Sequence, residues 1–280
     1  MRKMQKRPPT RRARKTRVLV FLVLALLLMA VSLLAPYLAP NDPNATNAAA
    51  QNAAPGAAYP LGADRYGRCV LSRVLAGART SIFSAVALVA VSGIVGSLLG
   101  VLCGYYGGVL DSVVMRLADI LLAFPQMVLA IAVAGVLGGG LLNAMLALGV
   151  TSWTLYARLA RSHTMACKAE PFIAAAKLSG CGDARILLCH ILPNIAGPLI
   201  VNAATQLGTT MIGIAGLSFL GLGVVPPNAE WGSMINEARS YIQLAPWTVL
   251  APAGATVLTV MIFNCLGDAV RDLADESGVA

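Results

Sequence analysis

Four uncharged hydrogen-bonding side chains recur along one apolar stretch, Ile195–Leu217. Asn202, Thr205, Gln206 and Thr209 are spaced i, i+3, i+4 and i+7, so a helix would place them in one stripe. An amide or hydroxyl surrounded by hydrocarbon is costly unless it finds a partner. We therefore expect the stripe either to line a wet pathway for a polar solute or to hydrogen-bond to neighbouring helices.

Residue types that carry catalysis or bind metals are sparse. The motifs H-E-x-x-H, G-x-x-x-x-G-K-[ST] and G-x-S-x-G are absent, and the six cysteines are scattered without zinc-site spacing. The two histidines, His163 and His190, are also far apart. We expect no catalytic residue, no metal site and no cofactor bound by this chain. If ATP drives its function, another chain must bind the nucleotide.

The composition indicates a membrane protein. Hydrophobic residues make up 58% of the sequence and charged residues 12%, and the mean hydropathy is +0.74. Soluble domains carry roughly 25% charged residues, so the bilayer is the natural solvent for this chain.

Six charge-free segments approach or exceed the ~17–25 residues that span a hydrocarbon core. They are Val18–Ala35, Ile82–Cys103, Ile120–Gly138, Leu141–Ala157, Ile195–Leu217 and Trp247–Leu266. Small residues recur in the second segment at Gly93, Gly96, Gly100 and Gly104, which favours close helix packing. We predict an all-α membrane protein with six transmembrane helices packed as a bundle.

The basic residues are distributed asymmetrically. With six spans and the amino terminus inside, sixteen of the 21 Lys and Arg fall on the cytoplasmic side, nine of them in the first 17 residues. By the positive-inside rule both termini are cytoplasmic. The net charge of +9 is then explained by contact with membrane lipid, and we expect no nucleic-acid partner.

The predicted organisation along the chain follows from these spans. A basic tail followed by an apolar run also fits a secretory signal, but eighteen uncharged residues favour an uncleaved anchor. The expected parts are a basic cytoplasmic tail (1–17), a first transmembrane helix (18–38), an external linker with an interfacial helix (39–79), a five-helix core (80–268) and a cytoplasmic tail (269–280). The core includes a cytoplasmic loop (158–194) and an external loop (221–246).

Two external segments are expected to be amphipathic. Residues 70–79 predict a helix lying on the outer surface, with arginines that extend to the headgroups. In the external loop, a helix would place Met234, Ile235, Ala238 and Ile242 on one face. That element could line an outer vestibule or merely cap the bundle.

The cytoplasmic stretch EPFIAAAKLSGCGDARILLCHILPN, Glu170–Asn194, has helix-turn-helix signals. Pro171 suits a first helical turn, and Gly180-Cys181-Gly182 would end that helix. Asp183 is expected to cap a second helix, Ala184–Leu192, which Pro193 follows. A compact helical knob with exposed apolar side chains could seat in a groove of another protein.

This stretch resembles the "EAA" loop of bacterial binding-protein-dependent ABC importer permeases, with Gly180 as its glycine and HILPN as its end. Three further blocks are similar to the second permease subunit of the dipeptide/oligopeptide/nickel family. They are LGADRYGRCVLSRVLAGAR (Leu61–Arg79), AGLSFLGLGVVPPNAEWGSMINEAR (Ala215–Arg239) and FNCLGDAVRD (Phe263–Asp272).

The resemblance implies an ABC type I importer permease fold in the inner membrane of a bacterium. It implies a heterodimer with a homologous permease, two ATPase subunits that bind ATP and Mg, and a solute-binding protein. The cytoplasmic loop would be the coupling helix that contacts the ATPases. The residues assigned to coupling are Glu170, Phe172, Ala174, Ala175, Ala176, Gly180, Asp183, Arg185, His190 and Pro193.

The sequence departs from the family pattern at two places. Ala174-Ala175-Ala176 replaces the usual Glu-Ala-Ala, so the contact made by that glutamate is either missing or supplied by another residue, for which Glu170 is the candidate. Cys69 stands where an Asp is common. Family members transport dipeptides, oligopeptides, glutathione, nickel or chelated nickel. The segments AAKLSG and AEWGSMINEAR are slightly more similar to the nickel or metallophore members. The thiols and histidines are dispersed along the chain, however, so no bare-metal pathway is expected and a peptide or a chelate is favoured as cargo. A secondary transporter or channel is the alternative from another class, and charge-free spans argue against it.

Overall fold

The computed structural model describes residues 11–276, and this part of the chain is helical, with one isolated antiparallel bridge between Ala63 and Cys69. The α-helices are α1 (Arg11–Leu33), α2 (Ala35–Leu38), α3 (Val70–Tyr106), α4 (Gly108–Leu122), α5 (Gln126–Leu137), α6 (Leu141–Lys168), α7 (Pro171–Leu178), α8 (Asp183–Ile186), α9 (Leu192–Phe219), α10 (Trp231–Ala238) and α11 (Trp247–Glu276). Short 3-10 turns occupy Ala48–Ala50 and Arg239–Tyr241, and a π-helical turn occupies Leu187–Ile191. The all-α prediction is confirmed. Parts of both predicted tails, residues 1–10 and 277–280, lie outside the described residues.

Four stretches are long and apolar enough to cross a membrane: Arg14–Leu33, Val70–Tyr106, Asp183–Phe219 and Trp247–Ala274. Helices α4 and α5 together would make a fifth. The remaining predicted span, Leu141–Ala157, forms the first part of α6, where polar side chains lower the hydropathy. The expected number of six is therefore not confirmed by the lengths and composition of the helices.

The predicted span Ile120–Gly138 is wrong as a single straight helix. Helix α4 ends at Leu122, Pro125 follows, and α5 starts at Gln126 with a bend of 92° between the two helices. Proline lacks the N–H that would continue the helical ladder, which explains the break. Helix α4 also contains Arg116, which the predicted topology counts among the basic residues of the cytoplasmic side.

The separate interfacial helix expected before the second span is also wrong. Val70 begins α3, which continues unbroken for 37 residues to Tyr106, a length of ~55 Å. Nor do its arginines all extend to headgroups, because Arg73 is 1% exposed. The segment is the buried end of a long helix.

Helix α3 packs closely against α6, as its glycines predict. A Cβ atom at Gly96 would lie 2.2 Å from the Trp153 carbonyl oxygen, and one at Gly100 would lie 2.2 Å from the Ala157 carbonyl oxygen. No larger residue fits either position without separating the two backbones.

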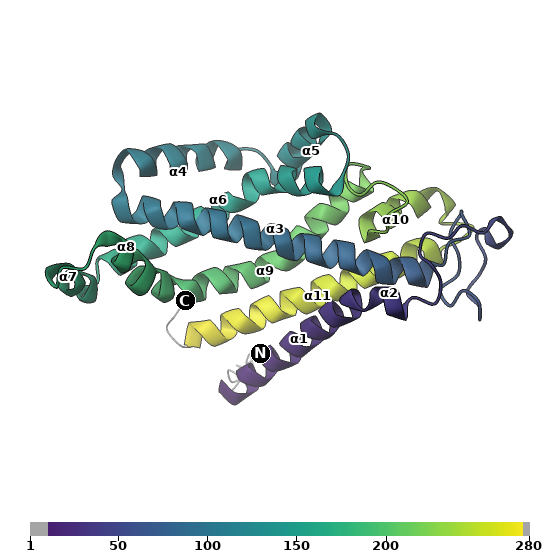
Figure 1. The fold of residues 1–280 in the computed structure, drawn as a ribbon, viewed down its shortest axis with the longest axis horizontal. Helices are drawn as coiled ribbons and strands as arrows, with labels where there is room; N and C mark the ends of the chain where they lie inside the picture. The colour runs from purple at the N-terminus through teal and green to yellow at the C-terminus, as the bar shows by residue number, and fades with distance from the viewer. Residues whose placement is uncertain (1–10, 277–280) are drawn as a thin grey trace, which may run out of the picture.

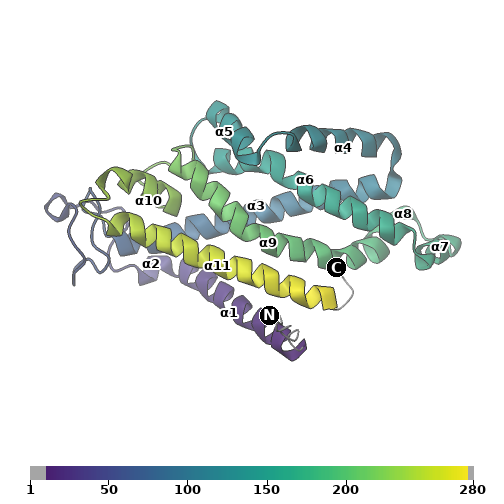
Figure 2. The ribbon, with the colours of Figure 1, turned by 180° about the vertical axis from the view of Figure 1, so that it is seen from behind.

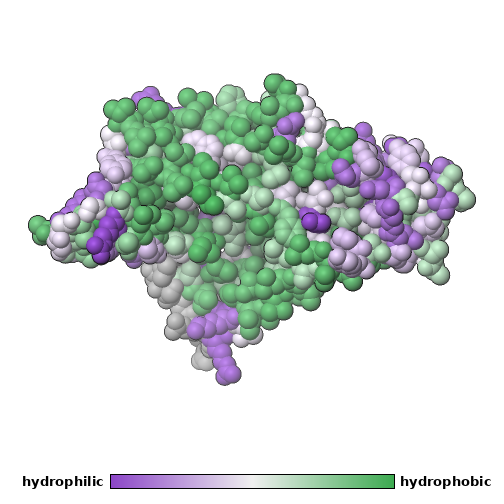
Figure 3. All heavy atoms as spheres, in the orientation of Figure 1, coloured by the Kyte–Doolittle hydropathy of each residue, from purple (hydrophilic) through white to green (hydrophobic). Residues whose placement is uncertain are grey.

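The long helices form an elongated bundle, and short elements lie at its two ends (Figures 1 and 2). Helices α7 and α8 lie at one end, and both ends of the described chain point toward that side. The linker between α2 and α3 lies with α10 at the opposite end. Figure 3 shows hydrophobic side chains over the middle of the bundle and hydrophilic side chains concentrated toward its ends, the pattern expected of a membrane-spanning protein.

Candidate functional site

The segment Glu170–Asn194, here called the docking segment, forms the tip of the α7 end. Pro171 occupies the first turn of α7, which ends at Leu178, and Gly180 has a φ of +80° that favours glycine. The first helix and the glycine turn match the sequence prediction. The second helix does not stop before Pro193: α8 and the π-helical turn lead directly into α9, and the turn's wider hydrogen-bonding pattern tolerates the missing N–H of proline.

The docking segment is anchored on one face and exposed on the other. Ile173, Ile186 and Ile191 are buried in a cluster with side chains of α3 and α6. Phe172 is 42% exposed, and Leu178 is 90% exposed. Glu170, Ala174, Ala175, Gly180, Arg185 and Pro193 are also exposed, while Ala176 and His190 are half-buried. The segment thus presents apolar and polar side chains on a firmly seated support.

A hydrogen bond ties the docking segment to α3. The hydroxyl of Tyr105 donates to Asp183 Oδ1 at 2.6 Å, and the ammonium of Lys168 donates to the Tyr105 carbonyl. Lys168 and Lys177 also lie over the Tyr105 ring, each 5.3 Å from its centre. Asp183 was predicted to cap a helix, but Gly182 is the cap residue and Asp183 bonds to Tyr105 instead.

The predicted polar stripe on α9 is divided between two surroundings. Gln206 and Thr209 line a cavity of about 240 Å³ between α5, α6 and α9. Thr205 faces α11, where a Cβ at Gly267 would lie 2.8 Å from its methyl group. Asn202 has a buried amide nitrogen without a hydrogen-bond partner in the described part of the chain.

Three polar residues that line this cavity, Gln126, Ser152 and Thr210, lie outside the predicted stripe. Gln126 follows Pro125 at the start of α5, and its amide donates to the Ser152 hydroxyl of α6 at 3.4 Å. Together with Thr209 and Gln206 they give the cavity neutral hydrogen-bonding groups. A polar residue directly after a helix-breaking proline was the available signal in the sequence.

At the α10 end, two sequence blocks far apart in the chain interlock. The buried carboxylate of Glu230 caps α10 by accepting from Gly232 N at 2.9 Å and Ser233 N at 2.8 Å. It also accepts a bond from Ser81 of α3 at 3.2 Å, and the Trp231 indole donates to the Val74 carbonyl at 2.9 Å. Of the face predicted for this helix, Met234 and Ala238 are buried, Ile235 is half-buried and Ile242 is 47% exposed. Helix α10 therefore packs onto the bundle.

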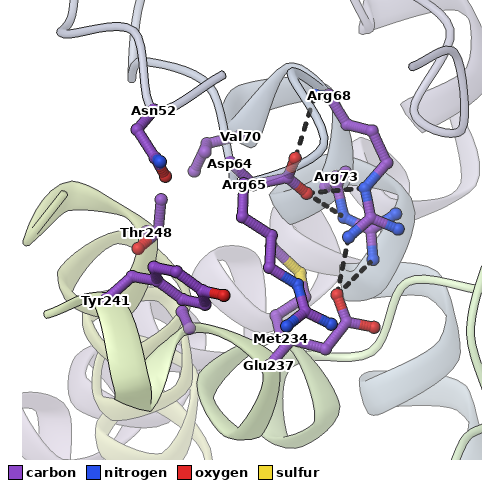
Figure 4. Close-up of a pocket in the computed structure, with 11 residues that line it drawn as sticks. Asn52, Asp64, Arg65, Arg68, Val70, Arg73, Met234, Glu237, Tyr241 and Thr248 are labelled. Atoms are coloured by element: carbon purple, nitrogen blue, oxygen red, sulfur yellow. Dashed lines mark hydrogen bonds and ion pairs between the residues drawn. The ribbon is translucent and has the colours of Figure 1, made fainter. Parts of the chain in front are cut away.

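Between α10 and the start of α3, the buried Arg68 and Arg73 and the half-buried Asp64 and Glu237 form a charged network (Figure 4). Arg68 lies 2.6 Å from Asp64 Oδ2 and 2.6 Å from Glu237 Oε2. Arg73 contacts the same two carboxylates at 3.7 and 3.8 Å. This network joins the block Leu61–Arg79 to α10, and no sequence pattern predicts it.

Cys69 is the cap residue of α3 and is 1% exposed. Burial raises the pKa of its thiol, but hydrogen bonds from Ser72 and Asn41 outweigh burial and hold that pKa below its ordinary value.

No group of three or more His, Cys, Asp and Glu side chains within residues 11–276 could hold a metal ion.

Comparison with known proteins identifies the family. Residues 96–276 match the family described as "Binding-protein-dependent transport system inner membrane component". Residues 11–55 match the N-terminal transmembrane domain of oligopeptide transport permease C.

Three similar proteins cover most of the chain. A probable D,D-dipeptide transport system permease protein of Escherichia coli is 41% identical over 256 residues, which are 91% of this chain and 85% of the relative. A dipeptide transport system permease protein of Haemophilus influenzae is 40% identical over 92% of this chain and 89% of its own. A glutathione transport system permease protein of Pectobacterium atrosepticum is 42% identical over 89% and 83%. The chain belongs to the family of binding-protein-dependent transport system inner membrane components, the permeases of ABC importers.

Proposed function

We propose that this chain is the permease subunit of an ATP-driven importer that moves dipeptides or other short peptides from an external binding protein into the cytoplasm. The observation that carries the proposal is the docking segment, which exposes Leu178 and Phe172 while its opposite face is buried against α3 and α6. An exposed apolar knob on a rigid support suits a groove in a partner protein. The names of the relatives supply the cargo class.

The proposed topology has six crossings: α1, α3, the bent pair α4–α5, α6, α9 and α11. Both termini and the docking segment lie in the cytoplasm, and the linker and α10 lie outside. The basic residues of the tail and of the 158–194 loop support this orientation. The proposed membrane is the inner membrane of a bacterium. The proposed boundaries of the tails, spans and loops are those predicted from the sequence, except for the bent span Ile120–Gly138 and the residues 70–79 that begin α3.

A homologous permease, two ATPases carrying ATP and Mg, and the binding protein complete the assembly. Movement of the ATPases displaces the docking segment, in which Glu170, Ala174–Ala176, Arg185 and His190 surround the apolar contact. The Tyr105–Asp183 hydrogen bond passes this displacement to α3, and the continuous helix through Pro193 passes it to α9.

The cavity lined by Gln206, Thr209, Gln126 and Ser152 is the proposed part of the pathway in this subunit. Its amides and hydroxyls can exchange hydrogen bonds with peptide groups, which are neutral and both donate and accept. It contains no formal charge, so it would hold a passing peptide only weakly.

Nickel or a nickel chelate is the second candidate cargo, and a channel is the third candidate function. Peptide is favoured because the three relatives named above transport dipeptides or glutathione. The test is uptake in cells lacking this chain, with labelled dipeptide and with nickel supplied free and chelated. Loss of dipeptide uptake alone supports the proposal, whereas loss of nickel accumulation alone rejects the peptide assignment. Dipeptide uptake that persists without the partner ATPases would point to a channel.

A further inference from the structure

A second cavity, of about 890 Å³, lies at the α10 end. Its walls come from the linker after α2, from α3, from the start of α6 and from residues 224–229. Arg79 is the one cation among the residues that line it, and Asp42 is the one carboxylate. Asn41, Asn44, Asn228 and Thr80 add neutral polar groups. In the proposed topology this cavity, here called the outer cavity, opens at the external side of the permease.

Two walls of the outer cavity are held by a single buried side chain. Arg73 donates from Nη1 to the Pro43 carbonyl at 3.2 Å and to the Pro227 carbonyl at 3.1 Å, so it ties the linker to the loop before α10. Arg73 is itself fixed by the ion network with Asp64 and Glu237. The cavity therefore has a defined shape without a ligand, which lowers the entropic cost of binding one.

Arg79 differs from the other arginines of this region. Arg68 and Arg73 each contact two carboxylates, whereas Arg79 has no hydrogen bond or ion pair within the described part of the chain. It is exposed and forms no ion pair with Asp42, although both line the same cavity. Arg79 lies nine residues after the start of α3, so its Cα atom sits ~14 Å along the helix axis. A free cation there is unnecessary for the fold and available to a ligand.

We propose that the outer cavity receives the zwitterionic form of a peptide released by the binding protein, with Arg79 holding its carboxylate and Asp42 facing its ammonium group. This inference rests on the proposed function. A guanidinium group binds a carboxylate with two parallel hydrogen bonds, which an amide cannot reproduce. The outer cavity thus recognises the two charged ends that every free peptide carries. The cavity lined by Gln206, Thr209, Gln126 and Ser152 offers the peptide only neutral groups.

The experiment uses the complete importer reconstituted in liposomes, with binding protein loaded to saturation. The probes are labelled L-alanyl-L-alanine and its C-terminal amide. Uptake and ATP hydrolysis are measured together for the natural chain, Arg79→Gln and the matched control Arg239→Gln. Arg239 is also an exposed arginine at the α10 end, but it does not line the outer cavity.

The natural chain and Arg239→Gln should import the free dipeptide. Arg79→Gln should keep the ATP hydrolysis stimulated by the binding protein but move about tenfold fewer dipeptides per ATP, the loss expected for one charge-assisted pair. The amide should be moved as poorly by the natural chain as by Arg79→Gln, because a site built for a charged group rejects an analogue lacking it.

Two results would overturn the inference while leaving the proposed function intact. One is an Arg79→Gln importer with unchanged dipeptide uptake. The other is an equal loss of both probes together with loss of the stimulated ATP hydrolysis, which would mean that Arg79 binds the binding protein itself. A natural chain that imports neither probe would instead reject the proposed function.

Discussion

The phenolic oxygen of Tyr105 lies 2.6 Å from Asp183 Oδ1, so the last turn of α3 is hydrogen-bonded to the first residue of α8. The two residues are 78 positions apart in the chain. This bond connects a long helix of the bundle to the segment proposed to contact the ATPases. It gives the coupling hypothesis a specific atom pair to test.

Replacing Tyr105 with Phe should uncouple transport from ATP hydrolysis. The ring and its contacts with Lys168 and Lys177 remain, and only the bond to the exposed Asp183 is lost, so folding should change by at most about 1 kcal/mol. Uptake per ATP hydrolysed should fall severalfold in the reconstituted importer. Tyr106→Phe is the control, because Tyr106 is 54% exposed and its hydroxyl has no hydrogen bond in the described part of the chain. Equal coupling in the two variants would argue against a role for the bond.

Changing Leu178 to Ser should weaken attachment of the ATPases without affecting the fold. Its side chain is 90% exposed, so its apolar surface is available for burial against a partner protein. A fully buried Leu stabilises a contact by about 2 kcal/mol, and co-purification of the ATPases should drop more than tenfold. Leu244→Ser, at the α10 end and 64% exposed, should have no effect. If the Leu178→Ser permease still retains the ATPases, Leu178 is not part of the interface.

The local features of the fold could be predicted from the sequence because their causes are local. The repeated glycines of α3 permit the close approach of another helix, and Pro171 and Gly180 mark the ends of a short helix in any surroundings. The break at Pro125 also has a local signal, the proline itself, but the charge-free run around it predicts a single span. Hydropathy measures composition along a segment and does not reveal its direction.

The sites could be predicted only in part, since their geometry depends on distant neighbours. The stripe on α9 was predicted correctly in spacing, yet a helical wheel cannot show that Thr205 packs against α11 while Gln206 lines the cavity that α5 and α6 also border. The Arg68–Glu237 pair joins residues 169 positions apart, and neither residue has a local pattern that announces it. Asp183 has a local pattern, but it is that of a helix cap. Its actual partner, Tyr105, lies 78 positions away and outside that local pattern.

Changing Gly100 to Ala should destabilise the packing of α3 against α6. The new Cβ atom would lie 2.2 Å from the Ala157 carbonyl oxygen, and a backbone atom cannot move aside as a side chain can. We expect a loss of about 2 kcal/mol, measured as a lower thermal unfolding midpoint of the assembled permease. Gly93→Ala on the same helix is the control, because its nearest new contact is the Tyr156 ring at 3.5 Å. If the two variants unfold at the same temperature, the close approach at Gly100 is not as described.

Replacing Arg73 with Met should destabilise the α10 end far more than replacing Arg79 with Met. Arg73 is 1% exposed, contacts two carboxylates and donates to the carbonyls of Pro43 and Pro227. Its removal leaves Asp64 and Glu237 sharing one arginine in a buried site and frees the linker from the loop before α10, at a cost of about 3 kcal/mol. Arg79 has no such partners in the described part of the chain, so its variant should unfold at the natural temperature while transport falls. Thermal unfolding of the two purified variants separates the roles. Equal destabilisation would mean that Arg79 also supports the fold, and would remove the ground for assigning it to a ligand.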